Sequence, residues 1–302
     1  MTAVKDKRVC LLVSDNTSHA DSASSLHDET SRRQVNTLQL GCAQRHIHLE
    51  PTIWYKHLDY SEFDSVIIGP VWDYLEQKDK FLKKLNEISE LVPLFNPVDV
   101  IKWNINKTYL RTLEHNDVPI VATLYADHAS CQNVSIAFDH FKTHKIIIKP
   151  CIGAGAWRQA CLEKADVLPK PDRLPMGACM MQPFMPSIVE EGEYSFLFFG
   201  GIFSHAILKR PKPGDYRVQY TYGGTECVYR PNQEEISFCK HILTVTNHIL
   251  KCGDLLYARI DLVRNLDGRF ALMEIELIEP YFFPEHGVHV GALFASSLET
   301  MF

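Results

Sequence analysis

The chain has 302 residues, of which 46% are hydrophobic and 23% are charged, and its formal net charge is -6 at pH 7. This length suits about two ordinary domains or one enzyme built from closely packed subdomains, and the composition argues against extensive disorder. A net negative charge argues against a partner held through nucleic-acid phosphates, so we expect small-molecule substrates.

The cysteines and the apolar segments indicate the cellular compartment of the protein. Nine cysteines are scattered along the chain without a CxxC pair, which favours reduced thiols over a disulfide framework or a zinc knuckle. The apolar run at 9–13 is too short for a signal-peptide core, and no stretch approaches the roughly 20 apolar residues that cross a bilayer. We therefore expect a cytoplasmic protein without a membrane partner.

The first hundred residues alternate between strands and helices. A buried strand is expected at 9–13, then a polar stretch at 14–33 and a helix that ends near Gly41. A second strand is expected at 64–69. An amphipathic helix at 80–91 and a short apolar strand in VPLFNP follow, and together they predict a β/α/β unit.

The middle of the chain is predicted to contain one helix over 103–119, a strand at 120–125 and a helix at 134–144. The apolar strand KIIIKP then runs directly into the glycine-containing loop CIGAGAW. Residues 166–177 are predicted as a loop, and MMQPFM resumes as a strand. Side chains at the end of a strand such as KIIIKP often line a ligand cleft.

The last third is predicted to form antiparallel strands. Two strand pairs carry turn signals: EYSFLFF with IFSHAILKR around Gly200-Gly201, and YARIDLVRN with RFALMEIELIE around Asp267-Gly268. A helix over 232–250 is expected between the two pairs.

The final hairpin places acidic side chains inside apolar strands. Asp261 lies within ARIDLV, and Glu274 and Glu276 interrupt LMEIELIEP. An ionised carboxylate in an apolar site is costly unless it is paired or bound to a metal. Strand alternation puts Glu274 and Glu276 on one face and Glu279 on the other, and the turn brings Asp261 alongside. The three acids predict an oxygen-rich Mg²⁺ site; the alternative is an edge hairpin with a solvated acidic face.

Basic residues and a glycine loop supply complementary groups. Lys107, Lys149 and Lys209 could provide the fixed cations that a triphosphate needs, and the loop at 151–157 offers closely spaced backbone N–H groups. This loop is neither GxxxxGK nor a complete GxGxxG. Arg217, predicted on a short strand, could bind a carboxylate or an acyl phosphate. Taken singly, these lysines could be solvated, the loop an ordinary turn and Arg217 half of a surface salt bridge.

In chain order, several segments resemble the ATP-grasp superfamily, in particular its glutathione-synthetase-like and RimK-like carboxylate-amine ligases. They are WDYL, FNPVDVIKWNINKTYL, IIIKPCIGAGAW, MMQPFMPSIVEEGEYSFLFFGGIFSHAILKRPKPGDYRVQ, YGG, ARIDLV and MEIELIEP. The resemblance implies a mixed α/β (α+β) ATP-grasp fold. It divides the chain into an N-terminal pre-ATP-grasp β/α/β domain (1–102), a central lid subdomain (103–192) and a C-terminal antiparallel-sheet subdomain with the metal site (193–302).

The resemblance also implies a role for each matching residue, with ATP and two Mg²⁺ ions (Mn²⁺ is an alternative) between the lid and the C-terminal subdomain. Nucleotide binding falls to Lys107 and Lys149, to the phosphate-covering loop of Gly153, Ala154, Gly155 and Ala156, to Gln182 and Phe184 at the adenine edge, and to Glu190 or Glu191 near the ribose. Lys209 and Arg217 handle the phosphate and acyl groups, and Asp261, Glu274 and Glu276 hold the metal.

Two features depart from the family pattern. Many relatives end the metal motif in ExN, whereas Glu274 and Glu276 form ExE here, which adds a charge. The segment IIGPV stands before WDYL, where similar proteins often carry an Arg-Ser/Thr pair, so one substrate or phosphate contact is in doubt.

The activity implied by the resemblance is ATP-dependent joining of a small-molecule carboxylate to an amine through an acyl phosphate, in a protein that could form homo-oligomers. Alternatives are intramolecular ring closure, phosphoryl transfer without ligation, and a nucleotide-binding module without catalysis. A Rossmann dehydrogenase would require a glycine fingerprint after residues 9–13, where the sequence has SDNTSH instead.

Overall fold

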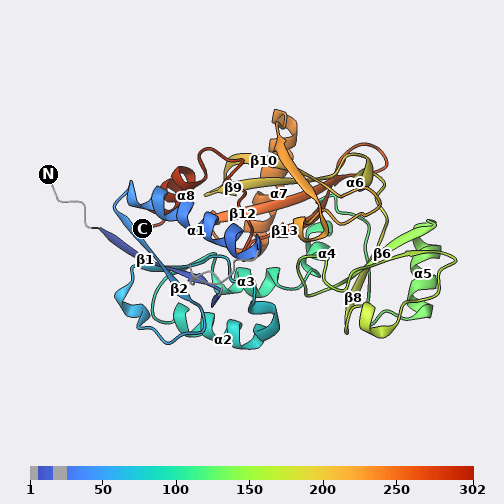
Figure 1. Ribbon diagram of the computed structural model, residues 1–302, viewed down its shortest axis with the longest axis horizontal. Helices are drawn as coiled ribbons and strands as arrows, with labels where there is room; N and C mark the ends of the chain where they lie inside the picture. Colours follow the sequence, from blue (N-terminus) through green and yellow to red (C-terminus); the bar gives the residue numbers. More distant parts are fainter. Residues whose placement is uncertain (1–5, 16–25) are drawn as a thin grey trace.

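The computed structural model of the protein describes residues 6–15 and 26–302, which form three sheets that follow one another along the chain (Figure 1). The strands are β1 (Lys7–Val13), β2 (Ile47–Ile53), β3 (Ser65–Ile68), β4 (Leu94–Phe95), β5 (Leu124–Ala126), β6 (Lys145–Pro150), β7 (Ala160–Glu163), β8 (Cys179–Pro183), β9 (Glu193–Phe199), β10 (Ile202–Arg210), β11 (Thr225–Tyr229), β12 (Tyr257–Arg264) and β13 (Phe270–Glu276). The helices are α1 (Leu26–Ala43), α2 (Lys78–Ser89), α3 (Val98–Asn104), α4 (Tyr109–Glu114), α5 (Cys131–Phe141), α6 (Ser187–Glu190), α7 (Gln233–Leu250) and α8 (Val290–Glu299).

The first sheet is parallel, in the order β2-β1-β3-β4, as expected for a β/α/β unit. The sequence did not predict β2, because Pro51 and alternating polar residues weaken its signal; Pro is tolerated there because β2 is an edge strand. Helix α1 begins at Leu26, earlier than expected, and residues 16–25 of the predicted polar stretch lie outside the described residues. Helix α8, which was not predicted, packs on α1 so closely that a Cβ at Gly41 would lie 2.1 Å from the Gly291 carbonyl oxygen.

The second sheet is antiparallel, in the order β5-β8-β6-β7, with α5 against it in the right-hand lobe of Figure 1. The single helix predicted over 103–119 is wrong: the chain forms α3 and α4 with a break at 105–108. In this break the Asn106 side chain accepts a hydrogen bond from the Thr108 amide (3.1 Å), and the Lys107 amide donates to the Cys151 carbonyl (2.8 Å). These bonds replace helical ones and fix Lys107 beside the loop after β6.

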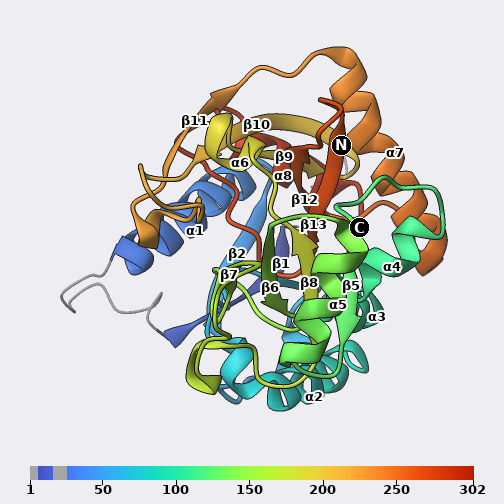
Figure 2. The same ribbon diagram turned by 90° about the vertical axis from the view of Figure 1, so that its right-hand side faces the viewer.

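The third sheet is antiparallel, in the order β11-β10-β9-β12-β13, and its two faces serve different purposes. One face packs on α7, which lies along the outer side of the molecule in Figure 2, and Phe196 and Ile260 belong to that core. On the opposite face Leu197 packs with the first sheet and α8, while Asp261 lines a cavity and the buried Ser195 donates a hydrogen bond to it. Because successive side chains along β9 and β12 point to opposite faces of the sheet, one face packs against α7 and the other face carries the polar side chains of the cavity wall.

Asn96 ties the first sheet to the third. It is 2% exposed, and its amide donates to the carbonyl oxygens of Tyr257 (3.0 Å) and Leu277 (2.8 Å) and accepts from the Leu256 amide (3.0 Å). Its φ of 52° lies in the left-handed region, which Asn tolerates better than most residues.

Asn96→Ala is expected to lower the free energy of unfolding by about 2–4 kcal/mol, because it leaves three buried backbone groups without partners. Urea denaturation followed by circular dichroism measures this loss. The control Asn116→Ala removes one exposed hydrogen bond to Thr112 and should change stability by less than about 0.5 kcal/mol. Equal losses in the two variants would contradict the role assigned to Asn96.

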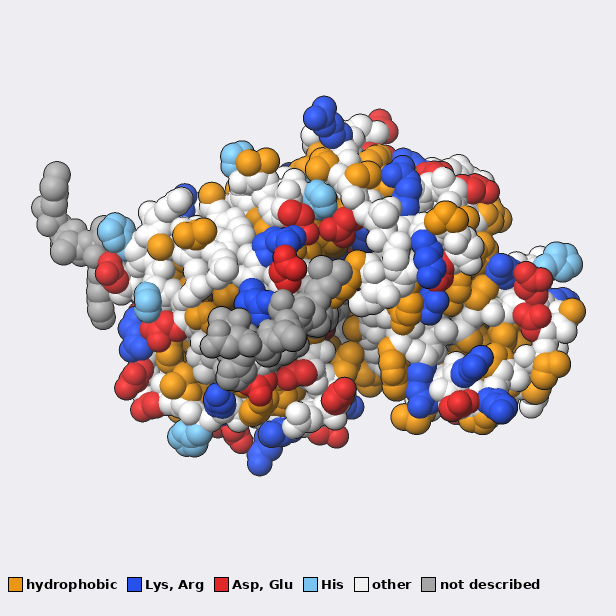
Figure 3. All heavy atoms as spheres, in the orientation of Figure 1, with side chains coloured by type: hydrophobic (Ala, Val, Ile, Leu, Met, Phe, Trp, Pro, Cys, Tyr) orange, Lys and Arg blue, Asp and Glu red, His pale blue; other side chains and the backbone are white. Residues whose placement is uncertain are grey.

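Basic and acidic side chains are intermixed over the face in Figure 3. Within the described residues, no helix combines the length and apolarity needed to cross a membrane, and the nine cysteines are all free thiols.

Candidate active site

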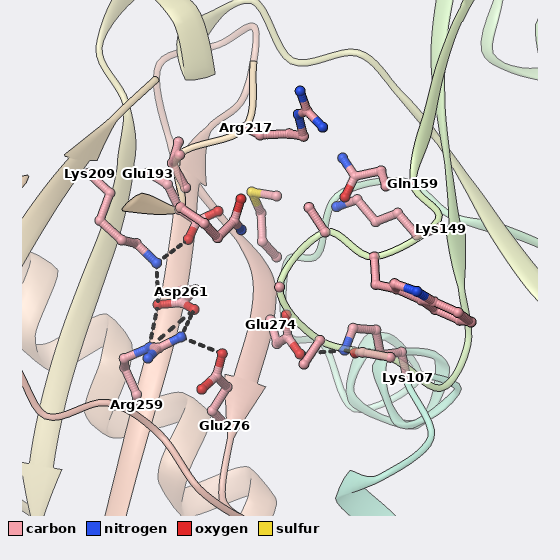
Figure 4. Close-up of a pocket in the computed structure, with 18 of the residues that line it drawn as sticks. Lys107, Lys149, Gln159, Glu193, Lys209, Arg217, Arg259, Asp261, Glu274 and Glu276 are labelled. Carbon is pink, nitrogen blue, oxygen red and sulfur yellow. Dashed lines mark hydrogen bonds and ion pairs between the residues drawn. The ribbon is translucent and has the colours of Figure 1, made fainter. Parts of the chain in front are cut away.

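A cavity of about 440 Å³ lies where the three sheets meet, and it collects most of the residues that the sequence singled out. All of the predicted site residues except Glu190 and Glu191 line it. Figure 4 shows Lys107, Lys149 and Gln159 reaching in from the side of the second sheet, opposite the acidic side chains of the third sheet.

The acidic wall comes from neighbouring strands in fixed register. Asp261 on β12 stands opposite Glu274 on β13 and Ser195 on β9, and a bulge follows Asp261. Asp261 is 2% exposed and accepts hydrogen bonds from Ser195 Oγ (2.5 Å) and Arg259 Nη2 (2.9 Å). Burial disfavours its charge, but Arg259 and Lys209 outweigh burial and hold the pKa of Asp261 below its usual range.

Arg259 is a site residue that the sequence analysis missed. It is 8% exposed, pairs with both Asp261 and Glu276, and lies among them in Figure 4. Burial would lower the pKa of its guanidinium, but Asp261 and Glu276 outweigh burial and raise it. The signal that identified Asp261, a charge inside an apolar strand, was equally present two residues earlier in ARIDLV.

Three lysines face the acids from different elements. Lys107 donates to the Gly153 carbonyl (2.7 Å) and pairs with Glu274 (2.5 Å), while Lys209 on β10 pairs with Glu193 and lies 3.5 Å from Asp261. Lys149 at the end of β6 forms no ion pair with any residue that the structure describes. Burial lowers the pKa of Lys149. An anionic ligand would therefore stabilise the charged form of Lys149 more than that of Lys107 or Lys209, which already have acidic partners.

The loop after β6 borders the cavity with an unusual backbone. Gly155, Ala156 and Arg158 have φ values of 60°, 57° and 50°, in the left-handed region that costs energy for residues other than glycine. Gly153, Ala154, Gly155 and Ala156 all line the cavity. Such a loop can present backbone N–H groups to an anion.

Part of the cavity lining is apolar, and we call this part the apolar slot: Ile147 and Met180 of the second sheet and Met273 of the third sheet belong to it. Apolar side chains of this kind suit a flat aromatic ring. Gln182 lies here with its amide bonded to Thr123 Oγ (2.9 Å). Phe184 lines the slot too, but its backbone N–H already donates to the Lys145 carbonyl (2.9 Å).

Glu190 and Glu191 lie outside the cavity, contrary to expectation. Glu190 ends α6 and is exposed, and Glu191 pairs with Arg264 (3.2 Å) and accepts a hydrogen bond from Tyr194 (2.7 Å). Gly192, with φ of 129°, turns the chain so that Glu193, not the preceding acids, enters the cavity at the start of β9. Sequence order alone could not decide which of three adjacent acids points inward.

Arg217 lines the cavity from a loop rather than from the predicted strand. Residues 215–219 are irregular because Asp215 organises them: it accepts from the Tyr216 and Arg217 amides and from Arg217 Nη2 (2.7 Å). The Arg217 guanidinium also lies 3.8 Å from the Tyr222 ring centroid. The hydrogen bonds from Arg217 lower the pKa of Asp215, so Asp215 and Arg217 form a charged pair. This pair holds the arginine side chain in place.

The donor set fits Mg²⁺, which prefers carboxylate and phosphate oxygens. Among the described residues, Asp261, Glu274 and Glu276 do not yet bring one oxygen each within 4.8 Å of one another. Lys107 and Arg259 neutralise them instead. The carboxylates would therefore exchange these partners for a metal carried in with phosphate.

The sequence is similar to a known family and to a known protein. Residues 9–96 match the family model "D-cycloserine synthetase DcsG, N-terminal domain". The cycloserine biosynthesis protein DcsG of Streptomyces lavendulae is 25% identical over 236 residues, which cover 74% of this chain and 78% of that protein.

Three solved structures are similar over nearly the whole chain. The structure of D-cycloserine synthetase DcsG has a TM-score of 0.83 at 22% identity and covers 97% of this chain and 99% of its own. D-alanine–D-alanine ligase from Bacillus anthracis, also solved with ATP, has a TM-score of 0.65 at 12% identity and covers 97% and 96%. The ATP-grasp ligase PsnB has a TM-score of 0.64 at 14% identity and covers 99% and 100%. The chain therefore has the mixed α/β ATP-grasp fold, and it is related in structure to the ATP-grasp ligases.

Proposed function

We propose that the protein is an ATP-dependent carboxylate-amine ligase that forms an amide through an acyl phosphate and releases ADP and phosphate. This proposal rests on one observation: acidic side chains line one side of the cavity and basic side chains line the facing side. Carboxylates of β12 and β13 face lysines and a loop of backbone N–H groups, which is the arrangement that a metal-bound triphosphate requires.

The two sides of the cavity would bind different parts of the nucleotide and its metal. The apolar slot near Gln182 would take the adenine, and Lys107, Lys149 and the 153–156 loop would hold the phosphates. Asp261, Glu274 and Glu276 would hold Mg²⁺, which neutralises phosphate charge when bound. Glu193 replaces Glu190 and Glu191 as the acid available to the nucleotide, because it alone of the three lines the cavity.

The reaction has two steps. A carboxylate oxygen of the first substrate attacks the γ-phosphorus, the bond to the β–γ bridging oxygen breaks, and ADP leaves. The amine then attacks the acyl carbon, loses one proton and expels inorganic phosphate. Lys209 offsets the developing negative charge and Arg217 orients the acyl group, so the protein acts mainly through position and charge.

Ring closure within a single substrate is a second candidate, favoured by the similarity to a D-cycloserine synthetase. Both reactions consume ATP and release ADP, so they differ only in the product.

Screening carboxylates with amines, ATP and Mg²⁺ is expected to release ADP only with a suitable acid, and mass spectrometry of the product identifies the reaction. A mass equal to acid plus amine minus water indicates ligation, and loss of water from one substrate indicates ring closure. A phosphorylated product that persists with every amine would contradict ligation.

Hydroxylamine provides a check on the first step, since it captures an acyl phosphate as a hydroxamate without a dedicated amine site. Absence of a hydroxamate from every acid that triggers ADP release would contradict the acyl phosphate.

A further inference from the structure

Glu279 is an acid that the nucleotide and metal roles leave unused. The sequence pattern put it on the opposite face from Glu276, but β13 ends at Glu276, and the chain turns so that Glu279 lines the same cavity. Among the described residues, Glu279 has no ion-pair partner, whereas Glu193, Asp261, Glu274 and Glu276 all have a lysine or arginine beside them.

The surroundings of Glu279 hold it in one position. Trp72 Nε1 donates to the Glu279 backbone carbonyl (2.9 Å), and the buried Tyr74 hydroxyl interacts with its carboxylate. The Trp72 ring meets the Tyr281 ring edge to face at 6.1 Å, and both rings line the cavity. Glu279 therefore lies in a part of the cavity that aromatic side chains line.

Among the described residues, no lysine or arginine lies within ion-pair distance of the Glu279 carboxylate, and the more distant Lys107 does not offset the effects of burial and Glu276 on its pKa. Burial, reinforced by the nearby Glu276, raises the pKa of Glu279 to about 8. A ligand with positive charge would relieve this cost, and aromatic rings such as Trp72 and Tyr281 are themselves good neighbours for ammonium groups. A carboxylate or phosphate group would be repelled.

We propose that Glu279, positioned by Tyr74, binds the ammonium group of the amine substrate. This assignment rests on the proposed function for the identity of the ammonium group as the attacking amine.

The step balances with these groups alone. One proton passes from the bound ammonium to the Glu279 carboxylate, which frees the nitrogen lone pair. The nitrogen attacks the acyl carbon, the carbon–nitrogen bond forms and the carbon–oxygen bond to phosphate breaks. The second proton passes from the nitrogen to the leaving phosphate, which departs as hydrogen phosphate.

A binding experiment tests the ammonium site without turnover. Glycinamide, which carries an amino group, is expected to raise the melting temperature of the wild-type protein, while acetamide, which lacks it, is not. Glu279→Gln should abolish the response to glycinamide, and Glu90→Gln, the same change at an exposed residue, should keep it. No glycinamide response in the wild type, or the same response in Glu279→Gln, overturns the proposal.

Kinetics with the acid and amine found by screening separate this site from the metal site. In Glu279→Gln we expect the amine KM to rise about tenfold or more, the size of a lost charge-assisted hydrogen bond, while hydroxamate formation stays within about threefold of wild type. Tyr74→Phe, which keeps the carboxylate, should raise the amine KM less. Equal loss of amide and hydroxamate would assign Glu279 to the metal or the acid and overturn the proposal.

The two hypotheses fail in different ways. A wild-type protein that binds glycinamide through Glu279 but makes no hydroxamate refutes the ligase function and keeps the ammonium site. A protein that makes the hydroxamate and responds to glycinamide equally with and without Glu279 keeps the ligase function and refutes the site.

Discussion

Arg259→Met is expected to lower the free energy of unfolding by about 3–5 kcal/mol, the cost of leaving a buried ion pair half complete. Arg259 sits between Asp261 and Glu276, and its side chain is only 10% exposed. Methionine fills similar volume but leaves the two carboxylates without their shared counter-charge. Urea denaturation followed by circular dichroism gives the measurement.

The matched control is Arg269→Met, which breaks an exposed pair with Asp267 and should change stability by less than about 0.5 kcal/mol. Adding Mg²⁺ with a non-hydrolysable ATP analogue should recover part of the Arg259→Met loss, because the metal supplies the missing charge. A loss below about 1 kcal/mol would mean that the carboxylates are neutral or solvated rather than held by Arg259.

The sequence predicted most of this arrangement because the strongest signals were local. Apolar runs with turn residues located β9, β10, β12 and β13, and charges inside those runs located Asp261 and Glu274. The resemblance to a known superfamily then ordered these pieces into the ATP-grasp fold, which the structural neighbours confirm.

Several features that the sequence did not predict lie where the chain turns between regular segments. The break between α3 and α4 depends on a backbone hydrogen bond from Lys107 to Cys151, more than forty residues away, and the choice of Glu193 over Glu191 depends on the turn at Gly192. Glu279 faces the cavity only because β13 stops three residues earlier. Periodicity describes regular segments, so it gives no orientation beyond their ends.

Glu274→Gln is expected to reduce the rate of ADP release with the true substrates by about 100-fold or more, because the amide keeps the shape of the side chain but removes a metal-binding charge. The protein should stay folded, since Lys107 keeps its hydrogen bond to the Gly153 carbonyl. Steady-state ADP release measured over a range of Mg²⁺ concentrations gives the result. Glu163→Gln, which also removes a glutamate paired with a lysine, is the control and should retain the wild-type rate.

The dependence on Mg²⁺ decides how Glu274 acts. If Glu274 binds the metal, its loss should raise the Mg²⁺ concentration needed for half-maximal rate, and excess Mg²⁺ should restore part of the activity. If Glu274 only positions Lys107, Glu274→Gln should instead raise the KM for ATP and leave the Mg²⁺ dependence unchanged, since that lysine faces the phosphates. Wild-type activity in Glu274→Gln would remove it from both roles, and the metal would then have to rest on Asp261 and Glu276, with Arg259 displaced from between them.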